Sequence, residues 1–85
     1  MSKNPNFILK LSIVIQEYKK DIARTLLDSE QGLSEENLRE KFKGSKSLFE
    51  YHFGDMKRYG VVTKKPPYKL NFDDQTKKEL KKVIA

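Results

Sequence analysis

The chain has 85 residues, with 18 basic and 12 acidic side chains and therefore a net charge of +6, and it contains no cysteine. This length accommodates one domain with a small core, and the lack of cysteine excludes disulfides and thiolate metal sites. No apolar run approaches the roughly 20 residues of a membrane-spanning helix, and no small-residue cleavage site follows the first residues, MSKNPNF, as a secretory signal requires. We therefore expect a single cytoplasmic domain over residues 1–85.

The positive charge is unevenly distributed along the chain. Residues 45–72 carry six basic and two acidic side chains, so this segment holds four of the six excess charges. A local excess of this kind is what a nucleic-acid-binding module needs to attract phosphates. The alternative is a lysine-rich surface that only keeps the protein soluble.

Apolar residues with gaps of three and four run from Phe7 to Leu27, which predicts one face of a helix. Asn4-Pro5 supplies an N-cap followed by a proline at the first helical position. If it is unbroken to Ser29, this helix has about 25 residues and a length of roughly 37 Å. Residues 7–15 also alternate as in a strand, which is the alternative to the helix.

A helix of that length projects beyond a domain of this size, so residues 1–16 are interpreted as an N-terminal extension. Its apolar residues then need a cover. A second copy of the chain is the simplest cover and predicts a homodimer formed through the N-terminal helix. The alternative is that the segment from Phe7 to Ile15 folds back on its own domain.

A short second helix follows the extended link Gln31-Gly32-Leu33. Ser34 is its expected N-cap, and Glu35 and Glu36 suit the positive end of the helix dipole. The helix is expected to end at Lys43-Gly44, a turn of the kind found in helix-turn-helix motifs.

The third helix is predicted over residues 45–59. Ser45 is the expected N-cap, and Phe49, Phe53 and Met56 recur at i, i+4 and i+7 as one apolar stripe. Gly60 follows as a left-handed C-terminal cap. We expect this stripe to form a core with Leu38, Phe42, Ile22, Leu26 and Leu27.

Two short runs, Val61 to Lys65 and Tyr68 to Phe72, flank Pro66-Pro67. The β-branched start of the first and the alternation in the second predict a hairpin over residues 61–72 with a stiff proline tip. A last helix is expected within residues 73–85, capped by Asp73, with Leu80, Val83 and Ile84 as its apolar residues.

The stretch GSKSLFEYHFGDMKRYGVV resembles the recognition helix and first wing strand of the winged helix-turn-helix family, most closely its ArsR-like branch of small regulators. The matching residues are Ser45, Ser47, His52, Phe53 and Gly60-Val61-Val62. The resemblance implies a mainly α fold with a small β-hairpin: a three-helix core and two-stranded wing over residues 17–72, with the extension before it and the short helix after it.

The resemblance also implies a small transcriptional regulator that binds double-stranded DNA sequence-specifically. The third helix would enter the major groove, and the wing would contact the backbone or the minor groove. A dimer would place two such helices about 34 Å apart. Residue chemistry and the family's contact positions together give the candidate DNA-binding residues: Ser45, Lys46, Ser47, Glu50, Tyr51, Lys57, Arg58, Lys64, Lys65 and Lys69.

The sequence offers no constellation for catalysis. His52 is the sole histidine, the carboxylates are scattered, and no phosphate-binding loop is present, so we expect no enzyme activity, cofactor, metal site or small-molecule effector. Two alternatives to DNA regulation are a protein-interaction winged helix and a non-specific nucleic-acid or nucleoid-binding protein. Gly54 departs from the family pattern, because glycine within a helix costs roughly 1 kcal/mol, and a close helix contact or a bend would explain it. Lysine, glutamate and isoleucine usage suggests an archaeal source or an archaeal virus, with the host cytoplasm as its location.

Overall fold

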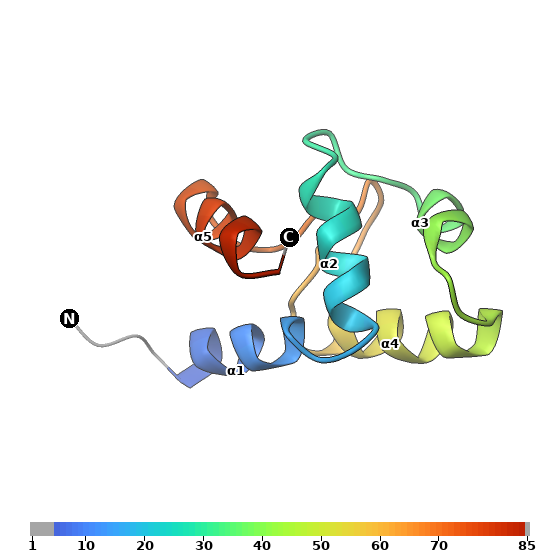
Figure 1. The fold of residues 1–85 in the computed structure, drawn as a ribbon, viewed down its shortest axis with the longest axis horizontal. Coiled ribbons are helices and arrows are strands. Elements are labelled where there is room, and N and C mark those ends of the chain that lie inside the picture. Colours follow the sequence, from blue (N-terminus) through green and yellow to red (C-terminus); the bar gives the residue numbers. More distant parts are fainter. Residues whose placement is uncertain (1–4, 85) are drawn as a thin grey trace.

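The helix at the centre of the fold is α2, which packs against the other four helices (Figure 1). The computed structural model describes residues 5–84 and the side chains of residues 9–84. The described helices are α1 (Pro5–Val14), α2 (Lys19–Leu27), α3 (Glu35–Lys41), α4 (Lys46–Arg58) and α5 (Asp74–Ile84).

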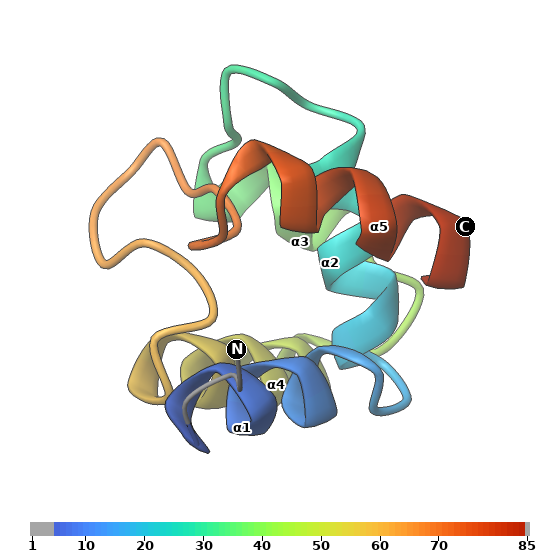
Figure 2. The same ribbon diagram turned by 90° about the vertical axis from the view of Figure 1, so that its left-hand side faces the viewer.

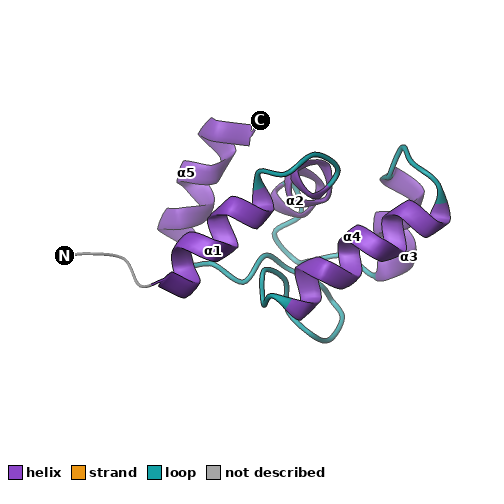
Figure 3. Cartoon of the chain, turned by 90° about the horizontal axis from the view of Figure 1, so that it is seen from below, coloured by secondary structure: helices purple, strands orange, loops and turns teal. Residues whose placement is uncertain are grey.

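The helices lie on two sides of α2. Figure 2 shows α1 and α4 below α2, and α5 above it. Seen from below, α1 and α4 lie nearest the viewer and α2 runs away from them (Figure 3). The face of α4 that points away from α2 is therefore on the opposite side of the molecule from α5.

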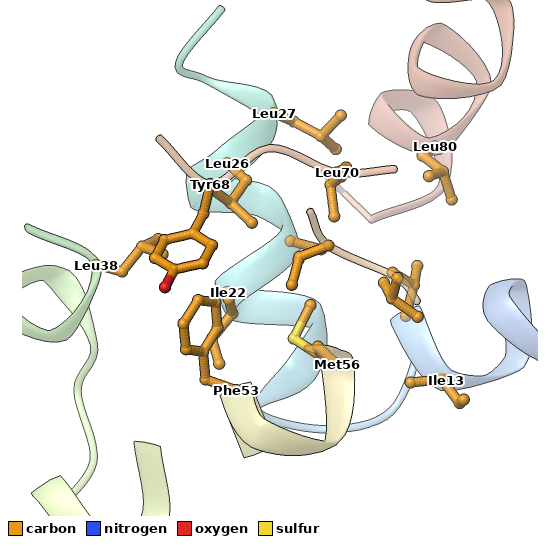
Figure 4. Close-up of a cluster of buried hydrophobic side chains, with 14 of the residues drawn as sticks. Ile13, Ile22, Leu26, Leu27, Leu38, Phe53, Met56, Tyr68, Leu70 and Leu80 are labelled. Atoms are coloured by element: carbon orange, nitrogen blue, oxygen red, sulfur yellow. The ribbon is translucent and has the colours of Figure 1, made fainter. Parts of the chain in front are cut away.

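The core is built where these helices meet the segment after α4. Ile22 and Leu26 of α2 face Phe53 and Met56 of α4 (Figure 4), and all four side chains are buried. Burial of one such side chain contributes about 1.5–3 kcal/mol relative to exposure. Every residue expected in the core belongs to this cluster or packs against it, so the predicted core is confirmed. Leu80 and Ile84 of α5 complete it, whereas Val83, also expected to be apolar-facing, is 70% exposed.

The predicted continuous helix to Ser29 is wrong, because the chain turns sharply between α1 and α2. Tyr18 has φ 69° and ψ −46°, and the Lys19 N–H donates to the Glu17 carbonyl at 2.8 Å. This i to i+2 hydrogen bond closes a γ-turn with positive φ, which is a rare and strained turn. The turn directs α1 back along the domain instead of letting it project.

The segment over residues 7–15 is a helix up to Val14, as predicted, and not a strand. Ile13 and Val14 are buried in the chain's own core, and Leu11 packs against it. The fold-back alternative therefore holds for these side chains, while Leu9 and Ile15 stay exposed. The side chains of Phe7 and Ile8 lie outside the described residues, and the homodimer remains a prediction.

The caps predicted at Ser34, Ser45, Asp73 and Gly60 are confirmed, whereas the N-cap expected at Asn4 lies outside the described residues. The side-chain oxygens of Ser34, Ser45 and Asp73 accept hydrogen bonds from backbone N–H groups in the first turns of α3, α4 and α5. At the end of α4, Gly60 has φ 74°, and its N–H donates to the Lys57 carbonyl. The Val61 N–H donates to the Met56 carbonyl at 2.8 Å, which completes a Schellman motif.

The predicted two-stranded wing is wrong, and with it the winged helix-turn-helix assignment of the fold. Residues 61–72 double back, but the described residues contain only two isolated antiparallel pairings, Leu33 with Tyr68 and Val62 with Leu70. The described part of the chain is thus helical without a strand.

The hydrogen bonds of its backbone N–H groups explain why the segment over residues 61–72 forms no β-ladder. The N–H groups of Val61 and Val62 both point to the Met56 carbonyl as part of the helix cap. The Lys69 N–H donates to the Thr63 hydroxyl instead of a backbone carbonyl, and the two prolines at the tip have no N–H. The pairing of Val62 with Leu70 therefore keeps only the hydrogen bonds from the Thr63 N–H to the Lys69 carbonyl and from the Asn71 N–H to the Val61 carbonyl, without the return bonds from Lys69 and Val61.

Candidate nucleic-acid interface

Helix α4 has a buried face and an exposed face, as its apolar stripe predicts. Phe49, Phe53 and Met56 are buried. The opposite side, here called the outward face, consists of Lys46, Ser47, Glu50, Tyr51, Gly54 and Arg58. Apart from the half-buried Gly54 these residues are exposed, and the Tyr51 side chain is 64% exposed. The structure thus brings five of the predicted DNA-binding residues onto one surface.

Gly54 lies in the middle of the outward face, with bare backbone around it. A Cβ atom added there would meet no heavy atom within 4 Å among the described residues. A close helix contact inside the chain therefore does not explain this glycine. An approaching molecule would reach the helix backbone here, which is one of the uses of glycine in binding surfaces.

The charges on this side of α4 nearly cancel. Lys46 and Arg58 against Glu50 leave a net charge of +1 on the outward face, and Asp55 partly offsets Arg58, since Arg58 Nη1 lies 3.3 Å from Asp55 Oδ1. The outward face therefore offers hydrogen-bonding and aromatic groups more than net charge.

A buried polar cluster supports the outward face from behind. Lys19 at the start of α2 is 3% exposed, and its Nζ donates to Nδ1 of His52 at 2.8 Å. The same Nζ lies 3.5 Å from Asp55 Oδ2. The ring of Tyr18 stacks on His52 with centroids 5.2 Å apart. Tyr51 neighbours the cluster, with Lys19 Nζ 5.5 Å from its ring centroid.

The cluster disfavours protonation of His52. Burial lowers the pKa of His52 below its ordinary value of 6.5, the Lys19 ammonium lowers the pKa further, and Asp55 opposes both. The neutral imidazole can accept from Lys19 at Nδ1, whereas the protonated ring has no free lone pair there. His52 is thus packed and hydrogen-bonded within the domain.

Sequence reasoning missed Lys19, because a lysine near a helix start is normally exposed. The sequence pattern that could have indicated a buried polar partner is the pair His52 and Asp55, spaced at i and i+3 on the side of α4 next to its apolar stripe. A carboxylate and an imidazole on one half-buried flank need a polar partner from another element.

The remaining predicted residues lie elsewhere. Ser45 is exposed but uses its hydroxyl for the cap. Lys57 points toward α3, where its Nζ lies 3.7 Å from Glu35 Oε1 and 4.9 Å from the Phe53 ring centroid. Lys64 and Lys65 are exposed in the loop over residues 63–67. Lys69 lies beside α5, away from the outward face.

Comparisons with protein-family models, with curated proteins and with solved structures find no match for this chain. Within the described residues, no group of three histidine, aspartate or glutamate side chains is placed to hold a metal ion. Over the same residues, no helix has the length and apolar character needed to cross a membrane.

Proposed function

We propose that this protein binds double-stranded DNA, with the outward face of α4 in the major groove, as a small transcriptional regulator. The observation that carries the proposal is that a 13-residue helix presents exposed polar side chains around a bare glycine, with its apolar side fully committed to the core. The major groove is wide enough to admit one α-helix. A protein with this function would work in the cytoplasm or on a nucleoid.

Residue chemistry assigns roles on this face. Lys46 can donate to guanine O6 or N7, Ser47 can donate or accept, and Glu50 can accept from cytosine N4. Tyr51 offers a hydroxyl group and a ring that can contact a thymine methyl. Because the face is nearly neutral, its contribution is base recognition more than attraction to phosphate.

The electrostatic attraction to DNA phosphates would come from the loop after α4. Lys64 and Lys65 are exposed in the loop after α4, and no carboxylate among the described residues pairs with them. Contacts from such lysines to phosphates give affinity that falls with salt. A second copy of the chain, joined through α1, would add a second α4 about 34 Å away on the same duplex.

A second candidate is a protein-interaction domain. Tyr51 and Tyr59 are both exposed large side chains on or next to α4, and tyrosine is enriched in protein interfaces. The near-neutral outward face is compatible with such a partner. This alternative predicts no sequence preference and little binding to DNA.

Fluorescence anisotropy on a duplex of about 30 base pairs tests the proposal, with salt between 50 and 200 mM. Lys46→Ala should weaken binding and lower the salt slope by about one. Lys82→Ala is the matched control, since it removes an exposed lysine from a helix on the other side. Lys64→Ala/Lys65→Ala should lower the slope by about two.

Selection from a randomised duplex pool then tests sequence preference, which Ser47→Ala and Tyr51→Ala should broaden. Equal losses for Lys46→Ala and Lys82→Ala would refute the role of α4. No binding at 50 mM salt would refute DNA binding as a whole and favour the protein-interaction domain.

A further inference from the structure

A second basic surface lies on the far side of the molecule. A groove of about 520 Å³ runs between α5 and the C-terminal end of α2, with Leu26, Leu27 and Leu70 in its lining. Its cationic residues are Lys69, Lys77, Lys78 and Lys81, and we call it the lysine groove. None of these residues belongs to the outward face of α4.

The lysine groove has an unbalanced charge. It contains four lysines and two carboxylates, Glu30 and Asp74, and neither of these two carboxylates forms an ion pair with any of the four ammonium groups. Like charges that converge around a hollow raise the local potential and attract anions. Lys77 and Lys81 are one helical turn apart, which puts their Cβ atoms about 5–6 Å from each other. That spacing is comparable to the separation of neighbouring phosphates on one strand.

The lining favours nucleic acid over protein as the occupant. Protein interfaces are depleted in lysine and enriched in aromatic residues, methionine and arginine. The lysine groove is lined by lysines and has no aromatic, methionine or arginine residue in its lining. Lysine is, in contrast, a standard contact for backbone phosphates, which need a charge and no fixed geometry.

The position of the groove separates it from the proposed DNA site. Helix α5 lies above α2 and α4 lies below it (Figure 2), and the outward face of α4 is opposite the buried side of that helix. The described part of the molecule is at least 22 Å across in every direction. A straight duplex in contact with the outward face therefore passes the lysine groove by, and only sharp bending at a cost of several kcal/mol would bring it there.

We propose that the lysine groove binds the phosphodiester backbone of a second DNA duplex, so that one chain bridges two duplexes. This inference rests on the proposed function for the first duplex. Contacts from lysine ammonium groups to backbone phosphates carry no sequence information, so the second duplex is held without regard to its sequence.

A bridging assay tests the inference with the full chain. One duplex of about 30 base pairs is immobilised on beads, protein is added, and capture of a second, fluorescent duplex is measured at 50 mM salt, with anisotropy on one duplex in parallel. Lys77→Ala/Lys81→Ala should lower capture about tenfold while single-duplex binding persists. Lys81→Ala and Lys82→Ala form the matched pair, because the two lysines are neighbours on α5 and only Lys81 lines the groove. Circular dichroism confirms that each variant is folded.

Three results would overturn the bridging proposal. The first is undiminished capture of the second duplex by Lys77→Ala/Lys81→Ala, which is expected if dimers alone join the duplexes. The wild-type chain could bind one duplex and capture no second one, which leaves the proposed function untouched. A labelled polyglutamate peptide could bind in a groove-dependent way while a second duplex does not, which would make the groove a site for an acidic protein.

A fourth result would refute the proposed site on α4 and leave the assignment of the lysine groove standing. If Lys46→Ala leaves single-duplex binding intact and Lys77→Ala/Lys81→Ala abolishes it, the outward face of α4 is not the DNA site. The assignment of the lysine groove to DNA backbone then stands, and the function proposed for α4 is wrong.

Discussion

The same substitution at two glycines should change stability in opposite directions. Gly54→Ala adds a methyl group in the middle of α4, where no described atom lies within 4 Å of the new Cβ apart from the adjacent residues and the backbone of α4 itself. Alanine is favoured over glycine in a helix interior by about 1 kcal/mol. Because no clash offsets this gain, we expect the free energy of unfolding to rise by about 1 kcal/mol. For a domain of this size that corresponds to an increase in Tm of about 4–8 °C.

Gly32→Ala is the contrasting variant. Gly32 has φ 87°, and a Cβ there would lie 2.9 Å from both the Pro67 Cβ and the Tyr68 carbonyl oxygen. The left-handed backbone alone costs a residue with a side chain about 1–2 kcal/mol, and the clash adds to that cost. We expect a loss of about 2 kcal/mol or more in the free energy of unfolding.

Urea denaturation followed by circular dichroism measures both variants. A Gly54→Ala variant that is no more stable than wild type would show that α4 is not a regular exposed helix at this position. Likewise, a Gly32→Ala variant with wild-type stability would refute the close packing of the link before α3 against the segment that contains Pro67.

Gly54→Ala also tests the proposed function, because stability and binding should diverge. If DNA approaches the bare backbone of α4, the methyl group should weaken binding although the protein is more stable. Val83→Ala is the matched control: it introduces alanine at an exposed position of α5, on the far side from α4, and should leave DNA affinity unchanged. An affinity unchanged by Gly54→Ala would place the DNA contact elsewhere.

Three further predictions concern the elements that position α4. The folded-state pKa of His52 is lowered, so as pH falls through 6.5 the unfolded chain binds a proton at His52 before the folded chain does. The free energy of unfolding should therefore fall with pH until the folded-state pKa is passed. In His52→Asn, the urea concentration at the unfolding midpoint should depend less on pH between about pH 7.5 and pH 5. Lys19→Met keeps the apolar stem but removes the charge-assisted hydrogen bond to His52, so chemical denaturation should show a loss of about 2 kcal/mol, and a stabilised variant would contradict this. Ser45→Ala removes the N-cap of α4 and should cost about 1 kcal/mol in the same assay, with wild-type stability as the refuting result.

Local chemistry made the helix ends predictable from the sequence. The caps at Ser34, Ser45 and Asp73 and the glycine after α4 each depend on a side chain and a backbone group within one turn of each other. The buried stripe of α4 was equally predictable, since helical periodicity alone decides which of its residues share a face.

The break after α1 was not predictable in this way. No proline or glycine lies between Ile15 and Lys19, and the apolar period continues across it. Tertiary contacts stabilise the turn, because the ring of Tyr18 stacks on His52 and the Lys19 ammonium lies beside Asp55. Contacts with residues more than thirty positions away along the chain thus outweighed the local preference for a continuous helix.

The expected strands failed for a related reason. Alternation correctly predicted that Tyr68 and Leu70 are buried while Lys69 between them is not. Alternation reports which side chains face the core, however, and not whether backbone groups are free to form a ladder. The Val61 N–H, which would return the hydrogen bond that the Val61 carbonyl accepts from Asn71, donates to the Met56 carbonyl at the end of α4 instead.

The distribution of charge shows most clearly what a sequence leaves open about a binding site. The segment over residues 45–72 holds four of the six excess charges, which favoured a basic recognition helix when they were counted along the chain. In space these charges separate: Lys57 pairs with Glu35 of α3, and Lys69 joins the lysines of α5. The outward face of α4 is left nearly neutral, and a second basic surface is assembled from two distant segments. Net charge per segment therefore does not predict which face of the folded chain carries that charge.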